Sequence, residues 1–186
     1  MKRLVVGITG ASGVVMGVEL LRVLQGMDGI QSHLVMTRGA VETLGYETQL
    51  SPEDVIPLAD EAYDIEDMGA VISSGSFRTE GMIVLPCSMK TVAGIASGFS
   101  ENLLLRAADV CLKEGRKVVL VPREMPLSRI HLRNLREAAE AGCVILPPML
   151  TFYNGADTVK KQVDHILGKV LMQFGMEYDG FRPWNP

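Results

Sequence analysis

The chain has 186 residues, of which 47% are hydrophobic and 22% charged, and its formal net charge is −4. This length fits one domain with a sizeable core, and a mild negative charge without a basic stripe argues against nucleic acid as a partner. No run of roughly 18 apolar residues occurs, which argues against a membrane span. The three cysteines form no C-x-x-C pair, so we expect a reducing, cytoplasmic location. The three histidines lack metal-ligand spacing, so we expect no metal site.

Strand and helix patterns alternate along the chain. Apolar β-type runs predict strands at Leu4–Ile8, His33–Met36, Ala70–Ile72, Met82–Leu85, Val118–Val121 and Val144–Leu146. Helical periodicity predicts helices at Val14–Met27, Ala40–Glu47, Met89–Ser97, Asn102–Glu114, Ser128–Ala141 and Thr158–Phe174. Gly115 and Gly142 are placed to end helices, and Asp157 to begin the last one. This alternation predicts an α/β fold, a single domain over residues 1–186 with a parallel sheet between two helical layers.

The first strand runs into a loop of small residues, Gly7-Ile-Thr-Gly-Ala-Ser-Gly13, and a helix follows at once. Strand, glycine loop and helix together aim backbone N–H groups at an anion, so we expect this loop to hold a phosphate. The spacing G-x-x-G-x-x-G differs from the dinucleotide fingerprint, and the second strand ends at Thr37 and Arg38 without a carboxylate for the ribose. Two alternatives remain: an NADP enzyme in which Arg38 holds the 2′-phosphate, and a loop that only makes a turn.

Polar residues also follow the later strands, and in a parallel sheet these strand ends share the edge where ligands bind. Pro86-Cys-Ser-Met-Lys-Thr91 leads into a helix that Ser88 can cap, which leaves N–H groups free for a phosphate or a ring carbonyl. We interpret Cys87 as a packed core cysteine, since no histidine neighbours it in sequence. Arg123 and Glu124 stand between two prolines, where they suit phosphate binding and proton transfer or form a surface ion pair.

Six motifs occur in order along the chain: Gly7–Gly13, Ser73–Gly81, Pro86–Thr91, Arg106-Ala-Ala-Asp109, Arg123-Glu-Met-Pro-Leu127, and Pro147-Pro148 with Phe152-Tyr153. Together they resemble the UbiX-like flavin prenyltransferases, in particular the members associated with phenolic-acid and aromatic-acid decarboxylases. The resemblance implies a three-layer αβα domain, Rossmann-like or flavodoxin-like, that binds FMN. It implies transfer of a dimethylallyl group from dimethylallyl phosphate to N5 and C6 of reduced FMN, without a metal. The product, prenylated FMN, would serve a UbiD-type decarboxylase of aromatic or phenolic acids.

The resemblance also assigns roles to individual residues. Contacts to FMN are implied for Gly10, Ala11, Ser12, Thr37, Ser88, Met89, Lys90, Thr91 and Arg123. Binding of the dimethylallyl phosphate is implied for Tyr153, Lys169, Arg106 and Lys113. Catalytic roles are implied for Glu47 and Glu124, as groups that handle protons, and for Ser12 beside the flavin. Lys169 stands where other members carry arginine, so it would bind phosphate as a point charge without the bidentate fork.

Two further readings concern activity and assembly. The alternatives to a prenyltransferase are an FMN-dependent aromatic acid decarboxylase and a non-catalytic, flavin-carrying subunit. Residues 175–186 form a tail with Tyr178, Phe181 and Trp184, which would leave an apolar patch if exposed. We therefore expect this tail to pack on a neighbouring subunit. The resemblance implies a large homo-oligomer, a dodecamer.

Overall fold

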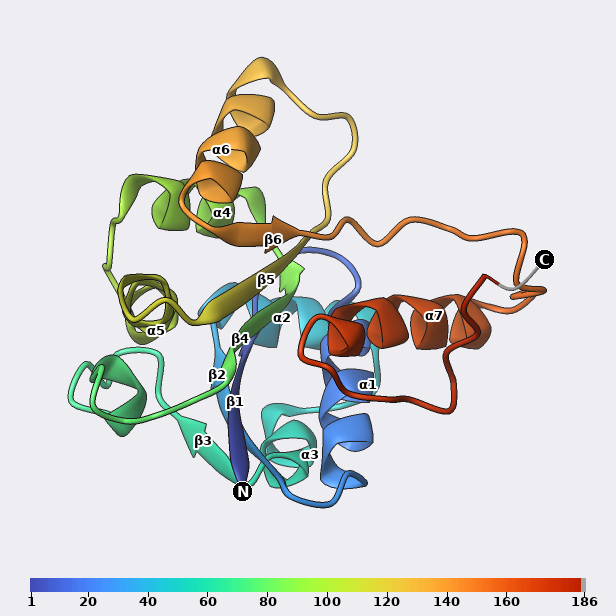
Figure 1. The fold of residues 1–186 in the computed structure, drawn as a ribbon, viewed down its shortest axis with the longest axis horizontal. Coiled ribbons are helices and arrows are strands. Elements are labelled where there is room, and N and C mark those ends of the chain that lie inside the picture. Colours follow the sequence, from blue (N-terminus) through green and yellow to red (C-terminus); the bar gives the residue numbers. More distant parts are fainter. Residues whose placement is uncertain (185–186) are drawn as a thin grey trace.

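Six parallel strands form the centre of the molecule (Figure 1). The computed structural model describes residues 1–184. The strands are β1 (Lys2–Ile8), β2 (Ile30–Met36), β3 (Glu61–Tyr63), β4 (Gly81–Cys87), β5 (Lys117–Pro122) and β6 (Cys143–Ile145). They lie in the order β3-β2-β1-β4-β5-β6, so the strand order reverses between β1 and β4. This is the order of a doubly wound nucleotide-binding sheet, which confirms the predicted α/β architecture.

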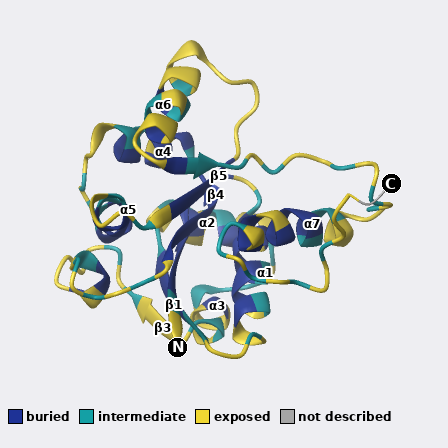
Figure 2. Cartoon of the chain, viewed as in Figure 1, coloured by how far each residue is buried: buried dark blue, intermediate teal, exposed yellow. Residues whose placement is uncertain are grey.

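Helices cover both faces of this sheet and bury two separate cores against it. The helices are α1 (Val14–Gln25), α2 (Arg38–Glu47), α3 (Pro52–Val55), α4 (Met89–Ser97), α5 (Leu103–Lys113), α6 (Arg129–Glu140) and α7 (Val159–Met172), with 3-10 turns at Ile56–Leu58 and Val71–Ser73. Apolar side chains of α1, α2, α3 and α7 form one core, and those of α4, α5 and α6 form the other. The buried central strands separate the two layers (Figure 2).

Two sequence-based expectations about the elements are wrong. Ala70–Ile72 does not form a strand. These residues lie at a 3-10 turn outside the sheet, from which Ala70 and Ile72 bury their side chains in the core formed by α4, α5 and α6. The third strand is instead Glu61–Tyr63, a short edge strand within an acidic and mostly exposed run that shows no apolar alternation. The second wrong expectation is the start of α7, where Thr158 and not Asp157 is the cap. The Asp157 carboxylate instead pairs with Lys161 at 2.6 Å.

After β6 the chain leaves the sheet as an extended arm, residues 146–158, and returns through α7 (Figure 1). The tail then runs back along α7 of the same chain. Phe181 packs directly on Gly168, where an added Cβ would lie 2.2 Å from the Cβ of Phe181 and 2.4 Å from its ring. The Tyr178 hydroxyl donates to Asp164 at 2.9 Å. Packing of residues 175–184 on a neighbouring subunit stays a prediction, and residues 185–186 lie outside the described part of the chain.

No helix among residues 1–184 combines the length and the apolar character that a membrane span needs.

Candidate functional site

A cavity of about 530 Å³ opens at the carboxyl edge of the sheet, beside the point where the strand order reverses. Its volume is within the usual range for small-molecule sites. Several residues assigned to FMN line this cavity: Gly10, Thr37, Ser88, Lys90 and Thr91. The cavity therefore gathers residues from the ends of β1, β2 and β4, which lie far apart in sequence.

Three helix N-termini face this cavity, those of α2, α4 and α5. Their caps are Thr37, Ser88 and Asn102, which all line it. Each cap oxygen accepts a hydrogen bond from the backbone N–H three residues later, at 3.1, 3.3 and 3.0 Å respectively. A capped N-terminus still leaves first-turn N–H groups without an intrahelical partner, and its dipole favours an anion. Three such ends around one cavity make a strong candidate for a phosphate site.

The charged side chains that line the cavity form two ion pairs with each other. Arg38 lies 3.2 Å from Glu66, and Lys90 lies 3.9 Å from Glu101. Both pairs are exposed, so each contributes less than about 1 kcal/mol and its cation can turn to a ligand at little cost.

Six lining residues had no site role in the sequence-based prediction: Gly39, Ile65, Glu66, Glu101, Asn102 and Leu105. Asn102 precedes an apolar run, which is the sequence signal of a helix cap and could have identified it. Glu66 lies in the acidic run of residues 60–67, which is typical of a solvated segment, and Glu101 lies in a polar connection, so neither sequence indicates a ligand site.

The glycine loop before α1 differs from the expected phosphate cradle. The backbone N–H of Gly13 donates to both carboxylate oxygens of Glu47, at 3.0 and 2.8 Å, and that of Val14 donates to Glu47 Oε2 at 3.0 Å. The anion at the α1 N-terminus is therefore a side chain of the protein. Gly10 faces the cavity instead, and a Cβ there would lie 2.7 Å from the backbone carbon of Gly39. At Gly10 the backbone of the loop after β1 therefore lies against the backbone at the start of α2.

Other residues assigned to FMN and to catalysis lie near this edge without lining the cavity. Ala11 and Met89 are buried and Ser12 is exposed. Arg123 and Glu124 are also exposed. The backbone N–H of Arg123 donates to the Cys87 carbonyl at 3.1 Å, and the Glu124 carboxylate accepts from the backbone N–H of the next residue at 2.9 Å. Cys87 is completely buried, and burial raises the pKa of its thiol, as expected of a core cysteine.

Comparison with known proteins identifies the family. The model of the Flavoprotein family matches residues 1–175. A "Probable UbiX-like flavin prenyltransferase" of Sedimentibacter hydroxybenzoicus is 59% identical over 183 residues, which cover 98% of this chain and 97% of the relative. The chain belongs to the UbiX-like flavin prenyltransferases.

Two solved structures of this family match the fold closely. One is a dodecameric FMN-dependent UbiX-like decarboxylase from Escherichia coli O157:H7, with a TM-score of 0.97 and 52% identity over 99% of this chain and 100% of that one. The other is AnUbiX (PadA1) in complex with FMN and dimethylallyl pyrophosphate, with a TM-score of 0.97 and 48% identity over 100% of this chain and 98% of that one.

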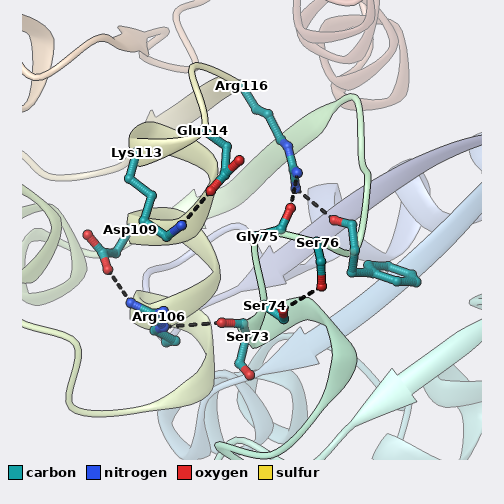
Figure 3. A network of polar contacts seen from close by, with 10 residues as sticks. Ser73, Ser74, Gly75, Ser76, Arg106, Asp109, Lys113, Glu114 and Arg116 are labelled. Carbon is teal, nitrogen blue, oxygen red and sulfur yellow. Dashed lines mark hydrogen bonds and ion pairs between the residues drawn. The ribbon is translucent and has the colours of Figure 1, made fainter.

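The residues that the family resemblance assigns to the prenyl donor lie in two separate places. Arg106 and Lys113 are on α5, where Figure 3 shows them beside the loop after the Val71–Ser73 turn. The Arg106 guanidinium donates to the Ser73 carbonyl at 3.2 Å and to Asp109 at 2.6 Å, while Lys113 pairs with Glu114. This pair forms the α5 half-site.

The other two donor residues lie on the opposite face of the sheet. Tyr153 is in the extended arm and half-exposed, and Lys169 is exposed on α7. The Tyr153 ring packs edge-on against His165, and the Lys169 ammonium lies 5.8 Å from the centre of the Phe181 ring. We call Tyr153 and Lys169 the α7 half-site. Because α5 and α7 belong to different cores, one chain does not bring the two half-sites together.

Proposed function

We propose that the protein transfers a dimethylallyl group from dimethylallyl phosphate to N5 and C6 of reduced FMN. The cavity ringed by three helix N-termini carries this proposal, in a chain that belongs to the flavin prenyltransferases. Its dimensions and donor set fit FMN: the helix ends supply N–H groups for the phosphate, and Ile65 and Leu105 supply apolar surface for the ring. Bound there, reduced FMN supplies the nucleophilic atoms that accept the prenyl group.

On the flavin side, the chain's own residues bind and orient. Thr37, Ser88 and Thr91 bring hydroxyl groups to the cavity wall, and Lys90 brings a cation. Gly10 lets the loop after β1 approach closely, and we place Ser12 and Glu124 next to the reacting edge as the groups that hold protons there. We assign Glu47 a second role besides catalysis, because its carboxylate already stabilises the N-terminus of α1.

On the donor side, the departing phosphate needs cations, since breaking the C–O bond leaves an anion and an allyl cation. Arg106, Lys113 and Lys169 supply positive charge, and Tyr153 supplies a hydroxyl donor. Their separation on two faces of one subunit supports a site that is completed by a second copy of the chain. A homo-oligomer, a dodecamer like the relative from E. coli O157:H7, would bring the two half-sites together.

We further propose a UbiD-type decarboxylase as recipient of the product and the cytoplasm as place of action. The three free, buried cysteines support a reducing compartment. The competing activity is decarboxylation of an aromatic acid by the protein itself, which is favoured by the naming of the E. coli O157:H7 relative as a decarboxylase.

One anaerobic experiment separates these activities. The purified protein is incubated with reduced FMN and dimethylallyl phosphate, and the mass of the extracted flavin is measured. A flavin heavier by one dimethylallyl unit is expected, and an unmodified flavin would contradict the proposal. A parallel incubation with dimethylallyl pyrophosphate, the ligand named for AnUbiX, tests which donor is used. Release of carbon dioxide from a phenolic acid without a partner protein would favour the decarboxylase. Addition of EDTA should leave the transfer unchanged.

A matched pair of variants tests the donor side. Lys169→Ala should raise the KM for the donor by about tenfold or more, the size expected when a hydrogen bond to a charged group is lost. Lys160→Ala removes the same charge from the same helix and should leave the KM unchanged, because Lys160 is exposed and, among residues 1–184, pairs only with Asp164.

A further inference from the structure

A small aromatic cluster surrounds the α7 half-site, and its central member has no role so far. The imidazole of His165 is 5% exposed and lies one helical turn before Lys169. Its ring centre is 5.9 Å from that of Tyr153, nearly perpendicular to it, and 5.1 Å from that of Phe181. Trp184 also packs edge-on against Tyr153, with ring centres 4.9 Å apart. From α7, His165 thus packs against both the arm and the tail.

The nitrogen Nδ1 of this imidazole is buried and has no hydrogen-bond partner among residues 1–184. A buried polar atom without a partner costs roughly 1–3 kcal/mol, and such atoms are rare in folded proteins. Phenylalanine would fill the same space among Tyr153 and Phe181 without that cost. Folding alone therefore does not explain a histidine here, which points to a use for its ring nitrogens in binding.

The surroundings favour the neutral form of this imidazole. Burial, and then the neighbouring Lys169 charge, lower the pKa of His165 below its usual value. A neutral imidazole carries one N–H donor, and hydrogen bonds from such donors to phosphate are favourable. His165 and Lys169 also line one cavity of about 360 Å³, together with Thr151, Gln173 and apolar residues of β6, the arm and α7. Tyr153 does not line this cavity but packs on the His165 ring.

We propose that His165 is a third phosphate-binding residue of the α7 half-site, donating a hydrogen bond from a ring nitrogen to the phosphate held by Tyr153 and Lys169. This inference rests on the proposed function, which gives Tyr153 and Lys169 the phosphate of the prenyl donor. It adds a neutral donor to a site whose other ligands are a phenol and an ammonium group. The geometry makes the three side chains one unit, because the His165 ring packs on both Tyr153 and Phe181, and the Lys169 ammonium lies 5.8 Å from the centre of the same Phe181 ring.

The chain carries its own reporter for the test. Trp184 is the only tryptophan, and it contacts Tyr153 directly. Inorganic phosphate is titrated into the FMN-loaded protein while tryptophan fluorescence is followed, and the KM for dimethylallyl phosphate is measured in parallel. The variants are His165→Phe, which keeps a ring but removes both nitrogens, and His165→Asn, which keeps a hydrogen-bonding group. His131→Phe makes the same change at a half-buried position on α6 and is the matched control.

His165→Phe should weaken phosphate binding and raise the KM by roughly tenfold or more, because a hydrogen bond to a charged group is lost. Its melting temperature should stay equal to that of the wild type or rise, since the unpartnered nitrogen is gone. His165→Asn should recover part of the affinity. His131→Phe should match the wild type in phosphate affinity and KM, although it removes the hydrogen bond that His131 accepts from the Ser128 N–H at the start of α6.

Phosphate affinity and KM of His165→Phe equal to those of the wild type would overturn the inference and leave His165 a packing residue. Absence of any saturable phosphate response in the wild type would overturn it too. A normal phosphate response without prenylated flavin would overturn the proposed function alone.

Discussion

Replacing Gly10 by alanine tests how the flavin cavity is built. A Cβ at Gly10 would lie 2.7 Å from the carbonyl carbon of Gly39 and 2.9 Å from its Cα and oxygen. These are backbone atoms of the first turn of α2, so no side chain can rotate away to relieve the contact. The loop after β1 and the N-terminus of α2 must therefore move apart, and both border the cavity.

The size of the effect follows from two opposing terms. Forcing a methyl group into a closed contact costs about 1–3 kcal/mol, while the stiffer unfolded chain of an alanine variant returns about 0.4–1 kcal/mol. The net loss is about 1–2 kcal/mol. For a chain of this length each kcal/mol lowers the melting temperature by roughly 2–4 °C, so we expect a decrease of roughly 2–8 °C. The affinity for FMN should fall by about tenfold, which corresponds to a loss of about 1.4 kcal/mol in binding.

The assay combines thermal unfolding with titration of FMN followed by quenching of its fluorescence. Gly45→Ala is the matched control: it is also in α2, but nothing lies within 4 Å of an added Cβ. There the substitution should stabilise the protein by about 0.5–1 kcal/mol and leave FMN binding unchanged. The reasoning is refuted if Gly10→Ala melts and binds FMN like the wild type.

Three further predictions concern single residues. Ser88→Ala removes the cap of α4 and should cost about 1 kcal/mol in thermal unfolding. Ser88→Asp should keep the cap but weaken FMN binding more than Ser88→Ala does, because it places a carboxylate at the anion site, and equal FMN affinity in the two variants would contradict this. Glu47→Gln should cost about 0.3–1 kcal/mol in urea unfolding, since it removes the negative charge from the α1 N-terminus. An unchanged urea midpoint would show that this charge does not stabilise α1. Burial lowers the pKa of His33, so below about pH 6.5 the unfolded chain binds a proton that the folded one does not. Stability should therefore fall as the pH drops from about 7 towards 5, less steeply in His33→Phe, and parallel pH profiles would refute the assignment.

The parts of the site that depend on local sequence could be predicted. The run Gly81–Cys87 is apolar throughout and is a fully buried strand, and Ser88 caps the helix behind it as expected. Gly115 and Gly142 end α5 and α6 with positive φ of 66° and 105°. In each of these cases one short segment contains both the signal and its consequence.

Contacts between distant segments could not be predicted in the same way. Glu47 reaches the amides of Gly13 across 34 positions of sequence, and nothing local in either segment indicates that a carboxylate fills this helix end. The α5 and α7 half-sites fall on opposite faces of the sheet because successive crossovers place their helices in different layers. The family resemblance proposes Arg106 and Lys169 as donor residues, but the sequence does not show the face on which each lies. β3 escaped prediction because an exposed edge strand has little apolar pattern to show.

Complementation between two variants tests most directly whether two copies of the chain complete one site. Arg106→Ala disables the α5 half-site and Lys169→Ala disables the α7 half-site, so at donor concentrations below the wild-type KM each homo-oligomer should make little prenylated FMN in a fixed time. Oligomers assembled from equal amounts of the two variants should recover about one quarter of the wild-type yield, because random pairing joins an intact α5 half-site to an intact α7 half-site in that fraction of interfaces. The readout is the mass of the extracted flavin. Mixed oligomers no more active than the separate variants would contradict a shared site.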